Sequence, residues 1–301
     1  MTIENINIQQ LIGRFFVKSK AVFKMLKFRL SLTVVFSAGM AFILGSPHQV
    51  DWMKFAVFIF AGFLVTSSSN ILNQIIEKDS DKLMTRTQNR PLPTGILSVK
   101  EAMVLAFLTG IFGVYMFLNF INISAALLAF ASLILYAFAY TPMKTVHPIA
   151  VFIGAIPGAL PPMIGWVGAT NHFGWEPGIL FAIQFIWQFP HFWAIAWVLD
   201  EDYKKAGIRL LPGTGQNINT AFQIMIYTVV LIPLGFIPYL MGMTGIVSAF
   251  IALLCGVLFL AQTFYLMKEC SRKAALQIMF GSFLYLPIVQ IAFVLDKVEK
   301  I

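Results

Sequence analysis

Long apolar runs alternate with short polar segments along most of the chain. A helix needs roughly 20 predominantly apolar residues to cross the hydrocarbon core of a bilayer. Nine segments approach this length: about residues 30–46, 54–72, 101–119, 123–140, 149–168, 178–199, 220–240, 245–266 and 275–295. The fifth is rich in glycine and proline over residues 153–166, and irregular backbone is tolerated at membrane depth only beside other helices or a cavity. The pattern predicts an all-α protein with nine transmembrane helices.

Composition supports this class and excludes others. Of the 301 residues, 59% are hydrophobic and 11% are charged, which leaves too little polar surface for a soluble globule. The net charge of +8 suits a nucleic-acid binder only in a soluble protein. Here the basic residues lie in short loops beside apolar runs, so no nucleic-acid partner is expected. Cys255 and Cys270 lack CxxC spacing and predict neither a disulfide framework nor a zinc site.

The basic residues also predict the orientation. All of the 21 lysines and arginines except Lys54, Lys297 and Lys300 fall on one side of the predicted membrane. Because cytoplasmic loops collect lysine and arginine, we expect the amino terminus and the long polar loops in the cytoplasm and the carboxyl terminus outside. No short apolar run with a cleavage site precedes the first span, so no cleaved secretory signal is expected. The predicted parts are a basic cytoplasmic segment over residues 1–29 and a single transmembrane domain over residues 30–301.

Polar side chains gather directly after the second predicted span. Asn73, Glu77 and Asp81 are four positions apart, and a helix over residues 70–83 would stack them along one face with a drift of about 40° per step. Asp79 lies off that row. A carboxylate within or beside a membrane span is costly and is a functional candidate by default.

A second acidic group, Asp200, Glu201 and Asp202, follows the sixth span on the same side of the membrane. Magnesium keeps several waters and is usually held by one or two carboxylates together with substrate phosphates. Two facing acidic groups would therefore suit a magnesium diphosphate. The alternative is that these acids only solvate cytoplasmic loops, where surface pairs contribute about 0–1 kcal/mol each.

Basic residues near both acidic groups could bind the phosphates. Arg86 and Arg90 offer planar guanidinium donors, which match phosphate oxygens better than lysine does. Lys144 and Lys204 could add point charges, although the positive-inside rule alone also accounts for Lys144.

An aromatic segment over residues 185–203 makes the sixth span unusual. Pro190 would kink or break the helix and free backbone groups inside a cavity. His191 is either a packed histidine that donates to a neighbouring carbonyl, a ligand to haem iron, or a contact to a substrate carboxylate or diphosphate. The aromatic side chains are accounted for by membrane packing, and any that face a cavity could stabilise an allylic cation by about 1–2 kcal/mol each.

Three stretches together resemble the protohaem IX farnesyltransferases of the UbiA prenyltransferase superfamily: NQIIEKDSDKLMTRTQNRPLP, WQFPHFW and DYKKAGIRLLP. The resemblance runs from about Phe28 to the last span. Asn73, Glu77 and Asp81 match the general superfamily pattern, whereas NRPLP and PHFW followed by DYKKAG point to the haem branch. One departure is that relatives in other branches have a DxxxD after the sixth span, whereas the acids here are contiguous. Of these three acids, Asp202 is the one that we assign to the site from the resemblance.

The resemblance implies nine helices around a central cavity in the bacterial inner membrane, with the active-site loops in the cytoplasm. It implies transfer of a farnesyl group from farnesyl diphosphate to a vinyl group of haem b, which gives haem O for terminal oxidases. It also implies Mg²⁺ held by the catalytic side chains Asn73, Glu77, Asp81 and Asp202. The substrate-binding residues that it suggests are Arg86, Arg90, Lys144 and Lys204 for diphosphate, and His191, Trp187, Trp193 and Tyr203 for haem or the prenyl chain. Haem A synthase or oxidase assembly components are the expected protein partners, beside the lipid bilayer.

Two other functions compete with this one. A prenyltransferase of the same build could use a quinone precursor as acceptor. A transporter could line an ion path with acids, but it would place charges near mid-bilayer in several spans, whereas the acids here gather at one interface.

Overall fold

The computed structural model describes residues 8–47, 49–213 and 215–298. Apart from one antiparallel bridge between Thr244 and Lys297, these residues form helices and loops. Nine helical stretches among them are long and apolar enough to cross a membrane, as predicted.

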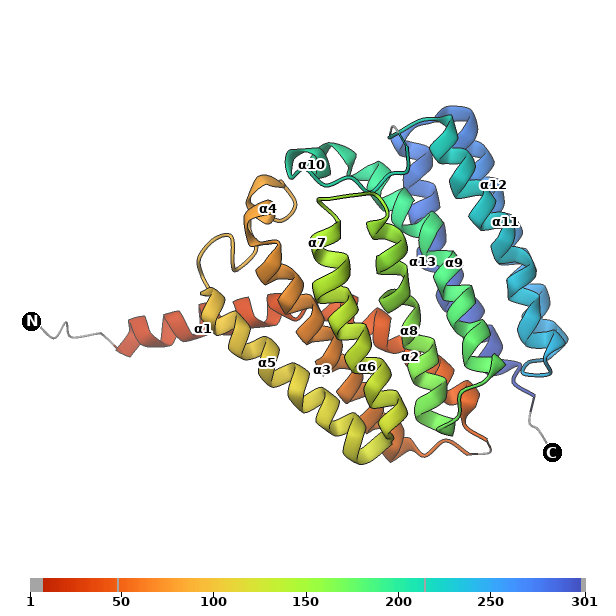
Figure 1. Cartoon of the computed structure of the whole chain (residues 1–301), viewed down its shortest axis with the longest axis horizontal. Coiled ribbons are helices and arrows are strands. Elements are labelled where there is room, and N and C mark those ends of the chain that lie inside the picture. The colour runs from red at the N-terminus through yellow and green to blue at the C-terminus, as the bar shows by residue number, and fades with distance from the viewer. Residues whose placement is uncertain (1–7, 48, 214, 299–301) are drawn as a thin grey trace, which may run out of the picture.

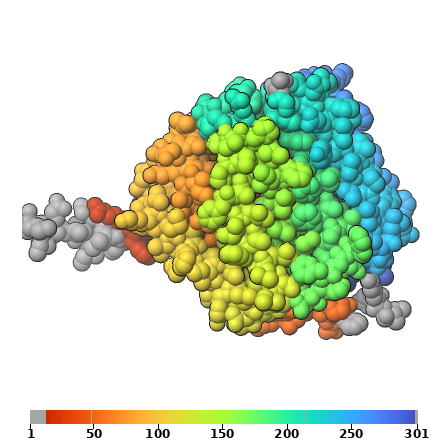
Figure 2. Space-filling model, viewed as in Figure 1, coloured from red at the N-terminus to blue at the C-terminus, as the bar shows by residue number. Residues whose placement is uncertain are grey.

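The spanning stretches run side by side in Figure 1. They are α2 (Phe28–Gly45), α3 (Trp52–Ile76), α5 (Val99–Met116) with a π-helical turn (Phe117–Ile121), α6 (Ile123–Ile134) with a π-helical turn (Leu135–Tyr140) and α7 (Thr141–Met143), α8 (Ala150–Thr170), α9 (Trp175–Val198), α11 (Ile218–Leu240), α12 (Ile246–Glu269) and α13 (Arg272–Leu295). The remaining helices are α1 (Ile8–Met25), α4 (Lys78–Leu83) and α10 (Asp200–Lys205). The short helices α4 and α10 lie at the same end of the bundle, and α1 projects sideways from it (Figures 1 and 2).

The bundle turns large apolar side chains outward, where they would meet lipid. On α5, for example, Val104, Phe107 and Leu108 are exposed, whereas Ala102 and Ala106 are buried against α3. Contacts between helices also join distant parts of the chain, because α2 packs against α8 and α13, and α9 packs against α8, α11 and α13. A small cavity of about 20 Å³ lies among α2, α8, α9 and α13, with Ser37, Gln184 and Gln290 in its wall.

Helix α8 differs from the irregular backbone expected over residues 153–166. It is interior, as predicted, but it is a continuous helix despite three prolines. A proline removes the hydrogen bond to the carbonyl four residues earlier, so Pro162 leaves the carbonyl of Gly158 without its helical partner. The Gln184 side chain on α9 donates to that carbonyl, with 2.8 Å between Nε2 and O. Side chains of neighbouring helices thus replace a bond that the α8 backbone cannot make.

Helices α2 and α8 approach each other closely at Gly165. A Cβ atom added there would collide with the backbone carbonyl of Ala38, which cannot move independently of α2. We expect Gly165→Ala to destabilise the protein by about 1–3 kcal/mol through overpacking. Thermal unfolding in detergent measures this, with Gly178→Ala as the matched control because a Cβ there meets nothing within 4 Å. Equal unfolding temperatures for the two variants would contradict the predicted contact.

Candidate active site

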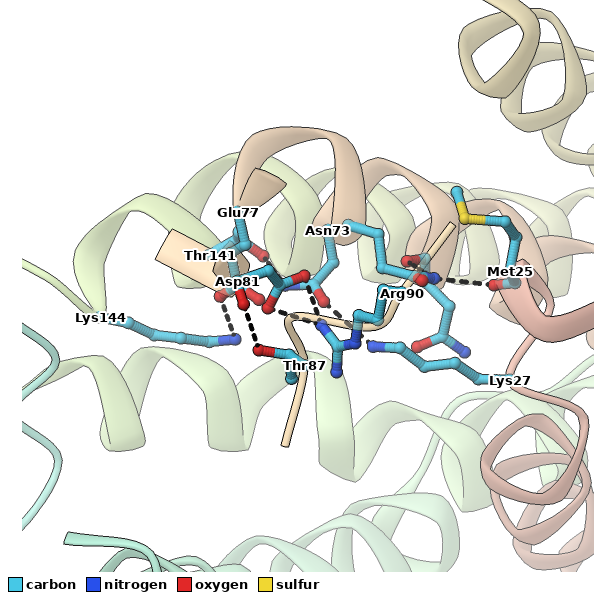
Figure 3. A network of polar contacts seen from close by, with 11 residues as sticks. Met25, Lys27, Asn73, Glu77, Asp81, Thr87, Arg90, Thr141 and Lys144 are labelled. Carbon is cyan, nitrogen blue, oxygen red and sulfur yellow. Dashed lines mark hydrogen bonds and ion pairs between the residues drawn. The ribbon is translucent and has the colours of Figure 1, made fainter. Parts of the chain in front are cut away.

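The predicted row of polar side chains is present where α3 meets α4. The helix expected over residues 70–83 is interrupted at Glu77, which separates α3 from α4. Two backbone hydrogen bonds nevertheless keep the four-residue spacing: Glu77 N–H donates to Asn73 O at 2.9 Å, and Asp81 N–H donates to Glu77 O at 2.7 Å. Asn73, Glu77 and Asp81 therefore lie together in Figure 3 despite the break.

Both carboxylates of the row are paired with a base. Arg90 Nη1 lies 2.8 Å and 2.7 Å from the two oxygens of Asp81, whose side chain is fully buried. Lys144 Nζ lies 2.7 Å from Glu77 Oε1, and each of these side chains is 12% exposed. Lys144 also sits over the ring of Tyr140, 4.4 Å from its centroid. Glu77 and Asp81 thus form buried ion pairs with Lys144 and Arg90.

Lys27 joins this network, although the sequence marked it only as one of the bases before the first span. Its Nζ donates to Asn73 Oδ1 at 3.1 Å, and Asn73 Nδ2 donates to the Thr141 hydroxyl at 3.2 Å (Figure 3). Lys27 has a left-handed backbone conformation (φ 46°) at the start of α2, which residues other than glycine rarely adopt. Three basic side chains, from three separate segments, therefore contact the row.

Burial and charge act in opposite directions on the Glu77–Lys144 pair. Burial by itself would raise the pKa of Glu77, but the adjacent ammonium of Lys144 holds that pKa below its ordinary value. Burial would likewise lower the pKa of Lys144, and the Glu77 carboxylate keeps it above the ordinary value. Both side chains are consequently charged at neutral pH.

Asp202 on α10 holds the loop that follows α4. Its oxygens accept from the backbone N–H groups of Thr85, at 2.9 Å, and Arg86, at 3.1 Å, and from Lys205 Nζ at 3.1 Å. Desolvation would raise the pKa of Asp202, but these hydrogen bonds hold it well below the ordinary value. Asp202 of the second acidic group is thereby bound to the loop that directly follows the first.

Some predicted site residues do not enter this network. Arg86 is exposed, and its side chain makes no ion pair with a described residue. Lys204 pairs with Asp200 at 2.6 Å while remaining 70% exposed, and Glu201 is exposed. The contiguous acids therefore differ in environment, and Asp202 is the one that contacts the loop next to Asp81.

The candidate acceptor residues lie deeper in the bundle or beside it. His191 and Trp187 stack on each other, with ring centroids 4.5 Å apart. Trp193 is buried and its ring contacts Tyr227 of α11 edge-on, at 5.2 Å. Tyr203 on α10 packs against the core at the end of the bundle that carries the acidic row. His191 and Trp187 therefore form a pair separate from Trp193 and Tyr203.

The donor atoms of the row fit a magnesium ion that arrives with a diphosphate. They are an amide oxygen and carboxylate oxygens, which are the hard ligands that Mg²⁺ prefers. Among the described residues, no three His, Cys, Asp or Glu side chains converge as a preformed metal cage. Mg²⁺ usually needs only one or two protein carboxylates, because water and substrate phosphates complete its shell. Lys27, Lys144 and Arg90 now contact these oxygens, so the oxygens already face positively chargeable groups, as they would face Mg²⁺.

Comparison with known proteins shows the family of the chain. Residues 34–286 match the model of the UbiA prenyltransferase family. A protoheme IX farnesyltransferase of Cytophaga hutchinsonii is 62% identical over 280 residues, which are 93% of this chain and 98% of that protein.

Two solved structures share the fold. A digeranylgeranylglyceryl phosphate synthase superposes with a TM-score of 0.77 at 22% identity, covering 93% of this chain and 98% of the other. A UbiA homologue from Archaeoglobus fulgidus, solved with GPP and Mg²⁺, superposes with a TM-score of 0.63 at 16% identity, covering 91% and 99%. The resemblance seen in the sequence is confirmed: the chain belongs to the UbiA prenyltransferase family, in the branch of the protoheme IX farnesyltransferases.

Proposed function

We propose that the protein transfers the farnesyl group of farnesyl diphosphate to a vinyl group of haem b, forming haem O and diphosphate, with Mg²⁺ at the donor site. The observation that carries the proposal is the buried network in which Asn73, Glu77 and Asp81 meet three basic side chains. The identity to a named protoheme IX farnesyltransferase over nearly the whole chain supports the acceptor.

The network is suited to an exchange of charges when the donor binds. The row Asn73, Glu77 and Asp81 would hold Mg²⁺, and Asp202 would support it from the second loop. Lys27, Arg90 and Lys144 would then turn from these oxygens to the phosphate oxygens, joined by Arg86 from the exposed loop. The bases already lie within hydrogen-bond distance of the row, so rotation of their side chains would release its oxygens.

The chemistry needs negative charge to be stabilised on the leaving diphosphate. Bound Mg²⁺ supplies Lewis-acid stabilisation of that charge. The bond between C1 of farnesyl and oxygen breaks, its electron pair stays with diphosphate, and the π electrons of the vinyl group attack the allylic cation. Water then adds to the resulting cation and loses a proton, which gives the hydroxyl of haem O. Arg90 and Lys144 would bind the departing anion throughout.

The site lies at one end of the bundle, as lipophilic substrates with one polar end require. We place that end at the cytoplasmic face of a bacterial inner membrane, from the distribution of basic residues. Residues 30–301 then act as a single catalytic domain, with residues 1–29 at the cytoplasmic surface. Haem A synthase or oxidase assembly components are the proposed recipients of the product.

A comparison of two acceptors tests the function. Membranes that contain the protein are incubated with farnesyl diphosphate, Mg²⁺ and either haem b or 4-hydroxybenzoate, and the products are identified by mass spectrometry. We expect haem O from haem b, and none when Mg²⁺ is chelated. A farnesylated benzoate without any haem product would assign the protein to the quinone branch instead, and absence of both products would contradict the transferase function.

A further inference from the structure

His191 has a buried imidazole that the diphosphate site does not use. It lies on α9 within the sixth spanning stretch and is 8% exposed. Val198, the last residue of α9, is seven positions later, so His191 lies about 10 Å along the helix from the end that carries the acidic row. Among the described residues, only one ring nitrogen of His191 has a hydrogen-bond partner.

The partner identifies which nitrogen carries the proton. His191 Nδ1 lies 2.7 Å from the hydroxyl oxygen of Ser282 on α13. That hydroxyl donates its single hydrogen to the carbonyl of Met279, 2.6 Å away. Since a carbonyl can only accept, the hydroxyl must accept from Nδ1–H. Nε2 is then unprotonated and presents a lone pair.

The ring is also held in orientation. Trp187 stacks on it with an interplanar angle of 17°, and Trp187 Nε1 donates to the backbone carbonyl of Ser282 at 3.1 Å. Phe283 of α13 meets the imidazole edge-on, with centroids 5.0 Å apart. Both α9 rings are thus hydrogen-bonded to the same residue of α13.

Nε2 has no hydrogen-bond partner among the described residues, and it is not one of their fully enclosed unpartnered polar atoms. Nε2 is therefore not fully enclosed by the protein, although His191 is not in the wall of the small cavity described above. Gln184, seven residues earlier and so on the same face of α9, lines the cavity among α2, α8, α9 and α13. This face of α9 carries polar groups along the inside of the bundle below the acidic row.

We propose that Nε2 of His191 is an axial ligand to the iron of the acceptor haem, and that Ser282 is the positioning residue that fixes its tautomer. Neutral imidazole is a common ligand of haem iron, and a ligating histidine usually donates its other ring N–H to a fixed acceptor. The stacked Trp187 and the edge of Phe283 add apolar surface for a porphyrin. The inference rests on the proposed function, because it concerns the acceptor of that reaction.

Haem binding to the purified full-length protein in nanodiscs tests the ligand. We expect the optical and electron paramagnetic resonance spectra of added haem b to show imidazole ligation in the wild type, and His191→Gly to lose this signature. Added imidazole should restore it in His191→Gly, which a merely structural role of His191 would not allow. Ser282→Ala keeps the ligand and should weaken haem binding about 10- to 100-fold.

His147 and His172 provide matched controls, because both lie outside the spanning stretches and are exposed. His147→Ala and His172→Ala should leave the spectrum unchanged. An unchanged spectrum in His191→Gly would overturn the inference, and so would failure of imidazole to restore the signature in a variant that still folds by size-exclusion chromatography. Haem O formation by the wild type is measured separately. A wild type that forms haem O while His191→Gly keeps the wild-type spectrum contradicts the ligand alone, whereas ligation without product contradicts the proposed function alone.

Discussion

Asp81→Asn is expected to reduce farnesyl transfer at least about 100-fold while the protein still inserts and folds. The substitution keeps the size of the side chain but removes the charge that Mg²⁺ and the leaving diphosphate depend on, and losing one preorganised electrostatic contact typically costs 10²–10³ in rate. The Asp81 side chain is fully buried, so a carboxylate on the surface cannot take its place. The initial rate of haem O formation, followed by mass spectrometry, measures the effect.

Asp79→Asn is the matched control. Asp79 is on the same short helix, two residues from Asp81, but its side chain is 88% exposed and pairs with Lys82. A surface pair of this kind contributes about 0–1 kcal/mol, so we expect near wild-type activity. Equal losses in the two variants would show that general negative charge on α4, rather than the buried row, supports the reaction. Full activity in Asp81→Asn would rule out the magnesium role.

Lys144→Met is expected to destabilise the folded protein strongly. The substitution removes the ammonium from a pair whose two side chains are each 12% exposed and leaves the Glu77 carboxylate buried without its counter-charge. Removing one partner of a buried ion pair typically costs about 3–5 kcal/mol. The free energy of unfolding in detergent, from denaturant titration followed by helix content, measures the effect. Activity should fall as well, since Lys144 is a proposed diphosphate ligand.

A double-mutant cycle separates the charge effect from the loss of packing. Glu77→Gln with Lys144→Met removes both charges, so the double variant should be more stable than Lys144→Met alone. Additive losses would indicate that the two side chains do not interact.

The pH dependence gives a second check on this pair. Glu77 has a depressed pKa, so its contribution is present above the ordinary glutamate pKa and is lost as pH falls through the folded-state value. Lys144 has a raised pKa, so its contribution is present below the ordinary lysine pKa and is lost as pH rises through the folded-state value. The pair's stabilisation should therefore be constant between about pH 5 and pH 10.

The location of the charged network also bears on the transporter alternative. A transport path would need ionisable side chains near mid-bilayer in several spans. In the described residues, the buried ion pairs lie at the junction of α3 and α4 and beside α7, at one end of the bundle. The interior polar side chains Ser37, Gln184 and Gln290 are uncharged and bind one another. The arrangement suits a charged site at one end of the bundle, with an uncharged interior beyond it.

The sequence by itself determined the class of fold and one side of the site. Hydropathy and helical period are local properties, so nine spans and the row of Asn73, Glu77 and Asp81 could be read directly from residue spacing. The motifs around Arg90 and His191 were likewise sufficient to identify the family, which the comparisons confirm. The roles of the individual site residues stay predictions.

Only the tertiary structure decided which groups meet. Lys27 reaches Asn73 across 46 residues, Lys144 reaches Glu77 across 67, and Asp202 reaches Thr85 across 117. Such pairings depend on how helices pack, and no local pattern encodes them, so Lys27 looked like any base beside a membrane. The continuity of α8 was also decided by contacts, because the Gln184 and Gln188 side chains of α9 donate to α8 carbonyls. For the same reason, the free nitrogen of His191 could be identified only once Ser282 of α13 was seen to bind the other one.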